Sequence, residues 1–99
     1  MKTVLITGAS SGIGRATARL LANNYRLILC GRRTEKLIEL QTELSSTPTH
    51  VLTFDVSNKE QVFQAIQSLP SEWQTIDILV NNAGNAHGLA PFQDADLAD

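Results

Sequence analysis

The feature that most constrains the fold is the stretch from Thr7 to Gly14, Thr-Gly-Ala-Ser-Ser-Gly-Ile-Gly. Its three glycines stand between a short apolar run, residues 4–6, and a segment with helical periodicity. A short apolar run bounded by glycine predicts a buried strand. Where a strand leads through a glycine turn into a helix, the N–H groups of the first helical turn and the positive end of the helix dipole are available to an anion. The sequence therefore predicts a phosphate-binding turn at the first β–α junction.

Each glycine has a distinct expected role in this turn. Gly8 lets the chain turn sharply off the strand, Gly12 leaves room for a pyrophosphate to approach, and Gly14 allows close packing of helix and strand. The spacing Gly-x-x-x-Gly-x-Gly differs from the common dinucleotide pattern Gly-x-Gly-x-x-Gly. The stretch is not a Walker loop either, because no Lys-Ser or Lys-Thr pair follows the glycines.

A nucleophilic serine is the alternative interpretation of the same stretch. Residues 8–12 match Gly-x-Ser-x-Gly, the nucleophile elbow of α/β-hydrolases, with Ser10 as nucleophile. That elbow follows a strand deep inside a sheet, whereas this strand is the first element of the chain. A hydrolase would also leave Gly14 without a role. Nucleotide binding is therefore favoured over a serine hydrolase.

Four apolar runs recur along the chain, at residues 4–6, 27–30, 51–54 and 76–80, with helix-length polar segments between them. Near-continuous apolar strands that alternate with helices predict a parallel sheet covered on both faces. The fold class is thus α/β, with a doubly wound parallel sheet. In such sheets ligands lie at the carboxyl ends of the strands.

Three helices are expected, and capping residues predict their ends. The first is expected to end near Asn23-Asn24, where asparagine can take the left-handed turn that glycine usually takes. Thr34 is expected to cap the second, and Ser57, with Glu60 three residues later, to open the third as a capping box. The apolar residues predicted to be buried are Ile13, Ala16, Leu20 and Leu21 in the first helix, Leu37, Leu40 and Leu44 in the second, and Val62, Phe63, Ile66 and Leu69 in the third.

Composition excludes several classes of function. Ninety-nine residues make at most one small domain. A formal charge of −2 offers no basic surface for nucleic acid or an anionic membrane, and no apolar run is long enough to span a bilayer. The single cysteine, Cys30, is expected in the core, and with no apolar leader before the first strand it indicates a reducing, cytoplasmic setting. His50 and His87 lack the clustered partners of a metal site, so no metal is expected.

Two arginines follow the second strand, where NAD-preferring sites usually place a carboxylate. The guanidiniums of Arg32 and Arg33 suit a 2′-phosphate, to which arginine donates charge-assisted hydrogen bonds. Alternatively they are ordinary solvated charges, although cations at the start of a helix oppose its dipole. Arg15, just past the glycines, adds positive potential.

Polar residues also end the third and fourth strands. Asp55 either accepts a hydrogen bond from an adenine amino group or caps the third helix in place of Ser57, and the residues leave both open. In either case the backbone N–H of Val56 is available to an adenine ring. Asn81 and Asn82 are either turn residues or a tie between neighbouring loops that borders a cofactor.

With these residues in place, the chain resembles the amino-terminal half of a short-chain dehydrogenase/reductase. Three motifs in order carry the resemblance: Thr-Gly-x-x-x-Gly-x-Gly at 7–14, Asp-Val at 55–56 and Asn-Asn-Ala-Gly at 81–84. The Gly-Arg-Arg at 31–33 is similar to NADP-preferring members. The stretch from Ser68-Leu69-Pro70 through Trp73 is similar to bacterial 3-hydroxy-acid (serine-type) dehydrogenases.

The resemblance implies a Rossmann-type sheet of strand order 3-2-1-4 that is incomplete, with residues 1–99 as an NADP-binding half-domain. It implies that residues 8–13 hold the pyrophosphate, Arg32 and Arg33 the 2′-phosphate, Asp55 and Val56 the adenine, and residues 82–84 the ribose beside the nicotinamide. Asn81 would chiefly brace the sheet. The predicted cofactor-binding residues are Gly8, Ser10, Ser11, Gly12, Ile13, Gly14, Arg32, Arg33, Asp55, Val56, Asn82, Ala83 and Gly84.

The family's catalytic Ser, Tyr-x-x-x-Lys and helix Asn are absent from this chain and are expected beyond Asp99. The expected function is therefore the cofactor-binding part of an NADP-dependent oxidoreductase. That enzyme would transfer hydride to or from a small hydroxy or carbonyl compound and would be a homo-oligomer, a tetramer or dimer, at full length. The alternative is a non-catalytic NADP(H)-binding module. Because the fourth strand lacks the fifth strand that usually pairs with it, the 99 residues are expected to be marginally stable alone, to self-associate, or to persist only as the ordered part of a longer chain.

Overall fold

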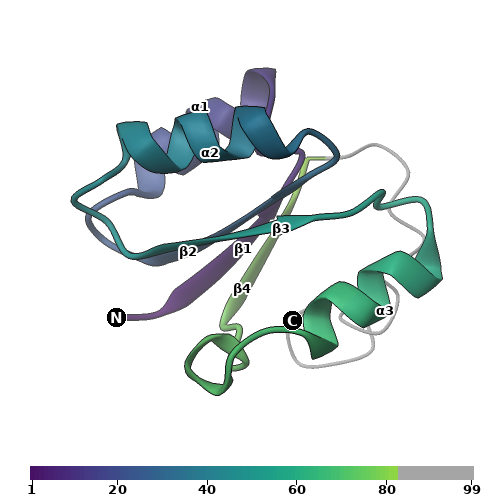
Figure 1. Cartoon of the computed structure of the whole chain (residues 1–99). Coiled ribbons are helices and arrows are strands. Elements are labelled where there is room, and N and C mark those ends of the chain that lie inside the picture. The colour runs from purple at the N-terminus through teal and green to yellow at the C-terminus, as the bar shows by residue number, and fades with distance from the viewer. Residues whose placement is uncertain (83–99) are drawn as a thin grey trace.

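The computed structural model describes residues 1–82, in which four parallel strands form one sheet of order β3-β2-β1-β4 (Figure 1). The strands are β1 (Thr3–Thr7), β2 (Arg26–Gly31), β3 (Thr49–Thr53) and β4 (Ile78–Asn81). The helices are α1 (Gly12–Leu21), α2 (Thr34–Glu43), α3 (Lys59–Gln67) and the short 3₁₀ helix η1 (Ser71–Trp73). The predicted fold class and strand order are confirmed.

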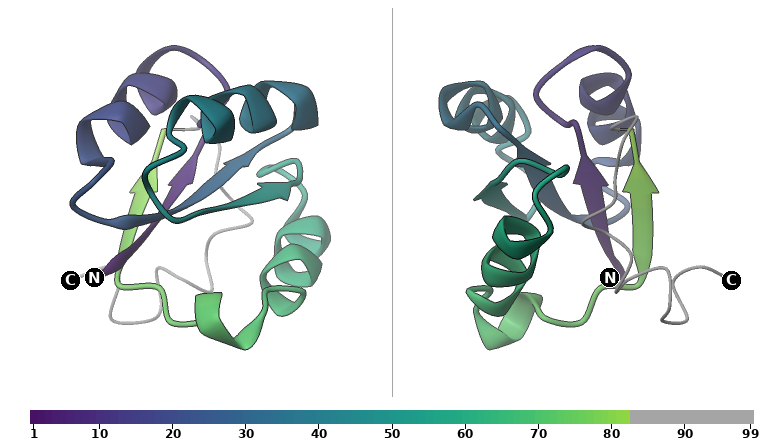
Figure 2. Two further views of the ribbon diagram at one scale, coloured as in Figure 1. Left: turned by 60° about the vertical axis from the view of Figure 1, so that its left-hand side comes forward. Right: turned by 90° about the vertical axis from the view of Figure 1, so that its right-hand side faces the viewer.

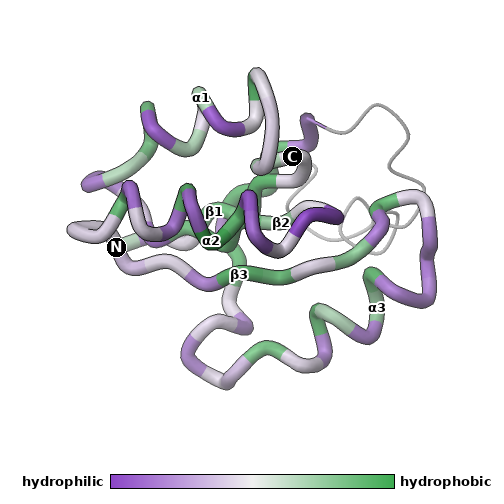
Figure 3. Tube along the Cα trace, turned by 45° about the horizontal axis from the view of Figure 1, so that its top comes forward, coloured by the Kyte–Doolittle hydropathy of each residue, from purple (hydrophilic) through white to green (hydrophobic). Residues whose placement is uncertain are grey.

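Helices cover both faces of this sheet, as near-continuous apolar strands require. Figure 2 shows α1 and α2 on one face and α3 on the other. Because successive strand residues point to opposite faces, each central strand contributes to two cores. Strand residues facing α1 and α2 are Val4, Ile6, Leu27 and Leu29, and those facing α3 are Leu5, Ile28 and Cys30, all fully buried. Coloured by hydropathy, β1 and β2 are mainly hydrophobic, whereas the helices alternate (Figure 3).

The buried face of α1 differs from the predicted one. Ile13 is 77% exposed and Leu20 is 78% exposed, whereas Gly14 and Ala18 are buried. A Cβ on Gly14 would lie 2.0 Å from the carbonyl oxygen of Gly8, so the start of the helix lies against the turn that precedes it. Only small residues fit at so close an approach. Ile13 and Leu20 therefore lie on the exposed side of α1, as does Ala16, whereas Leu21 is half-buried and packs against the core as predicted.

Two predicted helix caps were also wrong. Arg33 occupies the N-cap position of α2 and makes no side-chain capping bond, and the hydroxyl of Thr34 lies 2.8 Å from that of Thr53. The cap of α3 is Asn58, whose side chain accepts a hydrogen bond from the backbone N–H of Gln61. Ser57 does not cap α3, because its hydroxyl donates to a nearer acceptor within the preceding turn.

Most of the remaining core predictions are confirmed, although Ile66 is only half-buried against the core. Leu37, Leu40 and Leu44 are buried, as are Val62 and Leu69, but Phe63 is 54% exposed on the flank of α3.

Trp73 is buried in the core cluster on the α3 side of the sheet, together with Val62 and Leu69. The guanidinium carbon of Arg26 lies 4.0 Å from the centre of its ring, which is cation–π geometry, and half-buried His50 lies beside it. Asn23 has φ 75° after α1, the left-handed conformation predicted for it. Its backbone N–H donates to the hydroxyl of Thr47, which joins the end of α1 to the loop before β3.

Candidate functional site

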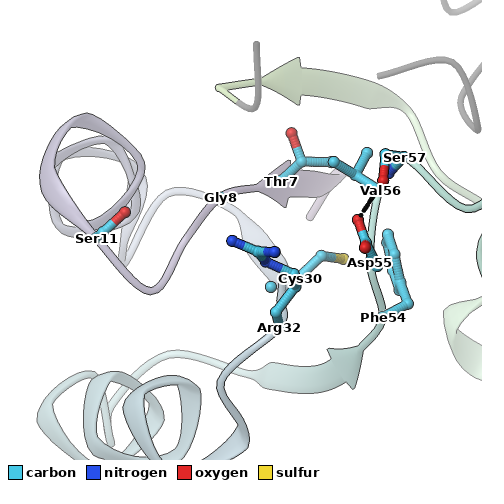
Figure 4. Close-up of a pocket in the computed structure, with 10 residues that line it drawn as sticks. Thr7, Gly8, Ser11, Cys30, Arg32, Phe54, Asp55, Val56 and Ser57 are labelled. Carbon is cyan, nitrogen blue, oxygen red and sulfur yellow. Dashed lines mark hydrogen bonds between the residues drawn. The ribbon is translucent and has the colours of Figure 1, made fainter. Parts of the chain in front are cut away.

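A cavity of about 420 Å³ opens at the carboxyl ends of β1, β2 and β3, where a doubly wound sheet places its ligands (Figure 4). Turns that follow three different strands converge on it. The lining residues are Thr7, Gly8, Ser11, Cys30, Gly31, Arg32, Phe54, Asp55, Val56 and Ser57.

The glycine turn forms one wall of this cavity. Gly8 has φ 63° and Gly12 has φ 43°, in the left-handed region that favours glycine. The backbone N–H of Ala9 donates to the carbonyl of Cys30 at 3.0 Å, which fixes the turn to β2. A Cβ on Gly12 would meet no atom within 4 Å. The turn therefore leaves open space beside its second glycine, where a ligand's phosphate can approach the backbone.

The first turn of α1 is not capped by a side chain. Ser11 stands at the N-cap in extended conformation, its hydroxyl makes no capping bond, and no acidic residue lies in the first turn. The first N–H groups of an α-helix have no partner within the helix. The positive end of the α1 dipole therefore has neither a side-chain cap nor an acidic residue, unlike α3, which has the neutral cap Asn58 and Glu60 in its first turn.

Arg32 and Arg33 occupy different places. Arg32 lines the cavity, and Figure 4 shows its guanidinium directed toward the turn at Gly8. Arg33 is the exposed N-cap of α2 and is not among the lining residues. A terminal nitrogen of the Arg15 guanidinium lies 3.8 Å from Oε2 of Glu39 in α2, and the buried Nε of Arg15 has no hydrogen-bond partner within the described part of the chain.

Asp55 is held by the turn that follows β3. Its Oδ1 accepts hydrogen bonds from the hydroxyl of Ser57 at 2.7 Å and from the N–H of Ser57 at 3.0 Å. These bonds, with a smaller contribution from the charge of Arg32, lower the pKa of Asp55 below its ordinary value. Asp55 is therefore ionised at neutral pH, and it does not cap α3.

One hydrogen-bond donor of this turn is free. Within segment 54–58 of the described chain, every backbone N–H donates to a protein acceptor except that of Val56. The Oδ2 of Asp55 likewise accepts no hydrogen bond from residues 1–82. An acceptor and a donor thus stand on adjacent residues at the cavity wall, a pattern complementary to the amino group and ring nitrogen of adenine.

At the end of β4, the hydroxyl of Thr7 donates to Oδ1 of Asn81 at 2.9 Å and accepts from the N–H of Asn82 at 3.1 Å. These bonds tie β4 to β1 beside the cavity, the bracing expected of Asn81. The Nδ2 of Asn82 is buried and has no hydrogen-bond partner among residues 1–82. Ala83 and Gly84, the other two residues predicted to border the ribose, lie outside the described residues, as does His87.

The cavity brings together five of the predicted residues: Gly8, Ser11, Arg32, Asp55 and Val56. Ser10, Gly12, Ile13, Gly14, Arg33 and Asn82 lie in the adjoining turns but are not lining residues. Sequence reasoning missed Ser57 and Gln61 as partners of Asp55. The Asp-x-Ser spacing of an Asx-turn and the Asn-x-x-Gln spacing of a shifted capping box are the signals that point to them.

The described residues contain neither a reactive thiol nor a metal site. Burial raises the pKa of the Cys30 thiol, which therefore stays protonated and unreactive. Among residues 1–82, no group of three or more His, Cys, Asp or Glu is placed to hold a metal ion. In the same range no helix has both the length and the apolar character needed to cross a membrane.

Comparison with known proteins yields consistent matches. The profile of the family described as short chain dehydrogenase matches residues 2–99. The probable NADP-dependent dehydrogenase in the aabA 3′ region of Dichelobacter nodosus is 48% identical over 97 residues, covering 97% of this chain and 91% of that protein. Serine 3-dehydrogenase of Rhizobium radiobacter is 46% identical over 98 residues, covering 98% of this chain and 39% of that enzyme.

Among solved structures, the closed form of serine dehydrogenase complexed with NADP⁺ superimposes with a TM-score of 0.77 at 42% identity. The match covers 83% of this chain and 33% of that one. This chain thus spans about two fifths of the length of most of the curated relatives it matches. On the strength of the family profile and these relatives, the chain belongs to the short chain dehydrogenase family.

Proposed function

We propose that this chain is the NADP(H)-binding part of an oxidoreductase that transfers hydride between a nicotinamide and a small hydroxy or carbonyl compound. The observation that carries the proposal is one cavity that combines an uncapped helix N-terminus, a guanidinium and an acceptor–donor pair. The names of the similar proteins support NADP as the dinucleotide.

The residues present fit such a dinucleotide by chemistry. The turn from Gly8 to Ile13 would hold the pyrophosphate, because its glycines leave the backbone open and the α1 dipole favours an anion. Arg32, with Arg33 beside it, would bind the 2′-phosphate through charge-assisted hydrogen bonds. The Oδ2 of Asp55 would accept from the adenine amino group, and the Val56 N–H would donate to the ring. Asn82, Ala83 and Gly84 would border the nicotinamide ribose.

When bound, the nicotinamide supplies the hydride acceptor or donor. The chain's own residues bind and orient the dinucleotide, and the groups that move the proton at the substrate are proposed to lie in sequence that follows Asp99 in a longer protein. That protein is proposed to act in the cytoplasm as a homo-oligomer, a dimer or tetramer, on a hydroxy-acid or serine-like substrate, the class named for its relatives.

The position of Arg32 provides the test. Calorimetric titration with NADPH and NADH should be carried out on the wild type, Arg32→Ala and Arg33→Ala. Arg32→Ala should weaken NADPH binding about 10- to 100-fold and leave NADH nearly unchanged, as expected for lost hydrogen bonds to a charged group. Arg33→Ala is the matched control, since the same charge is removed from a residue that does not line the cavity. Its effect on NADPH should be smaller.

Equal losses for NADPH and NADH in Arg32→Ala would refute the 2′-phosphate assignment. Absence of binding by a folded wild type would refute the function itself. Carbonyl-dependent NADPH oxidation, followed at 340 nm, separates an enzyme from the alternative of a non-catalytic binding module, and should require the longer protein.

A further inference from the structure

The side chain of Gln61, which lies outside the main cavity, is hydrogen-bonded to the turn that carries Asp55. The Oε1 of Gln61, in the first turn of α3, accepts a hydrogen bond from the backbone N–H of Asp55 at 3.0 Å. The backbone N–H of Gln61 donates to the side chain of Asn58 at 3.1 Å. Gln61 thus joins the start of α3 to the end of β3, although it is not among the residues that line the main cavity.

This bond completes a set that leaves Asp55 little freedom. Its N–H is held by Gln61, its Oδ1 by Ser57, and its carbonyl oxygen accepts from the N–H of Asn58 at 2.9 Å. Among the groups of this turn that have no hydrogen-bond partner within the described chain are the Oδ2 of Asp55 and the N–H of Val56. Both are therefore held in fixed directions before any ligand arrives, which reduces the entropy lost on binding.

We propose that Gln61 is a positioning residue for purine recognition: by holding the Asp55 amide, it aligns the Asp55 carboxylate and the Val56 N–H with the edge of an adenine. This inference rests on the proposed function. Gln61 lines a second, smaller cavity, together with Arg32, Thr53, Phe54 and Asp55. It does not line the main cavity. It acts on the ligand through Asp55 and not by direct contact.

The side chain of Gln61 is separable from the helix cap. The side-chain Oε1 of Gln61 accepts from the Asp55 N–H, whereas the capping bond is donated by the backbone N–H of Gln61 to Oδ1 of Asn58. Every substitution except proline retains that backbone N–H. Methionine preserves helix propensity and side-chain length but cannot replace the acceptor. Gln61→Met therefore removes one interaction while α3 stays capped.

The experiment measures dissociation constants for NADPH, NADH and the NADPH analogue with hypoxanthine in place of adenine. Hypoxanthine carries an oxygen acceptor where adenine has its amino group, and so mismatches the Asp55 and Val56 pair. Gln64→Met is the matched control, because Gln64 is exposed on the same helix and its side chain makes no hydrogen bond in the described chain. Circular dichroism checks that each variant is folded, and Gln61→Ala serves as a second variant.

We expect Gln61→Met to weaken NADPH and NADH by the same factor of about 3 to 10, the usual value of one neutral hydrogen bond. The preference of the wild type for adenine over hypoxanthine should fall in Gln61→Met and persist in Gln64→Met. A purely structural role would lower the melting temperature without changing that preference. Unchanged NADPH affinity in Gln61→Met, or equal losses in Gln64→Met, would overturn the inference. Failure of the wild type to bind NADPH would instead reject the proposed function.

Discussion

Replacing Gly14 with alanine tests how closely α1 approaches the turn that precedes it. The new Cβ would lie 2.0 Å from the carbonyl oxygen of Gly8 and 2.6 Å from its carbonyl carbon. Favourable contacts between carbon atoms lie at about 3.5–4.0 Å. The backbone of the turn or the helix must therefore move by more than about 1 Å, and no flexible side chain is available to move in its place.

Two opposing effects set the magnitude. Alanine is a better helix former than glycine by about 1 kcal/mol. Overpacking of a tight site costs about 1–3 kcal/mol and occasionally more, and a clash of backbone with backbone belongs at the upper end. We therefore expect a net loss of about 2 kcal/mol, or a melting temperature lower by roughly 8–16 °C for a domain of this size.

Thermal unfolding followed by circular dichroism measures the change. Gly12→Ala is the control, because a Cβ there meets nothing within 4 Å and the cost comes from the backbone alone, with φ at 43°. That strain is worth about 1–2 kcal/mol. If Gly14→Ala melted at or above the wild-type temperature, as helix propensity alone requires, the close approach of α1 to Gly8 would be wrong.

Two further predictions concern packing and ionisation. Leu40→Ala should cost about 2–5 kcal/mol in urea unfolding because the side chain is fully buried, whereas Leu20→Gln, at an exposed site, should stay within about 0.5 kcal/mol of wild type. A large cost for Leu20→Gln would contradict the observed burial. Ser57→Ala should raise the pKa of Asp55 toward its ordinary value in an NMR titration of the carboxyl group, because the hydroxyl bond is lost. Since the folded pKa of Asp55 is lowered, its stabilisation is present above its unfolded pKa of about 4 and is lost as pH falls through the folded value. The stability difference between wild type and Ser57→Ala should therefore shrink on acidification, and a constant difference would count against the Ser57 contribution.

The sequence predicted the sheet and the location of the site because both depend on local patterns. Apolar runs such as 27–30 are buried on both faces and have few alternatives, and Gly8 and Gly12 do adopt the left-handed conformations that their turn requires. The position of Arg32 directly after a strand placed it at the cavity for the same reason.

Helix details were less predictable, because several residues compete for one role. Serine and asparagine are both good capping residues. Asn58 caps α3 because the hydroxyl of Ser57 donates its hydrogen bond to the carboxylate of Asp55. Likewise, the sequence does not distinguish Arg32 from Arg33, but in the structure Arg32 lines the cavity and Arg33 stands exposed at the N-cap position of α2.

The sequence by itself determined the alternation of strands and helices, the strand order and the position of the glycine turn, since these follow from periodicity, glycine positions and the resemblance they carry. Tertiary structure alone decided which face of α1 is buried. The periodicity of Ile13 and Leu20 is helical, but the distance of the helix from the sheet is set at Gly14, where its backbone meets that of Gly8. At that distance only small side chains fit, so the approach of two backbone segments, which no hydrophobic pattern records, overrode the apolar stripe.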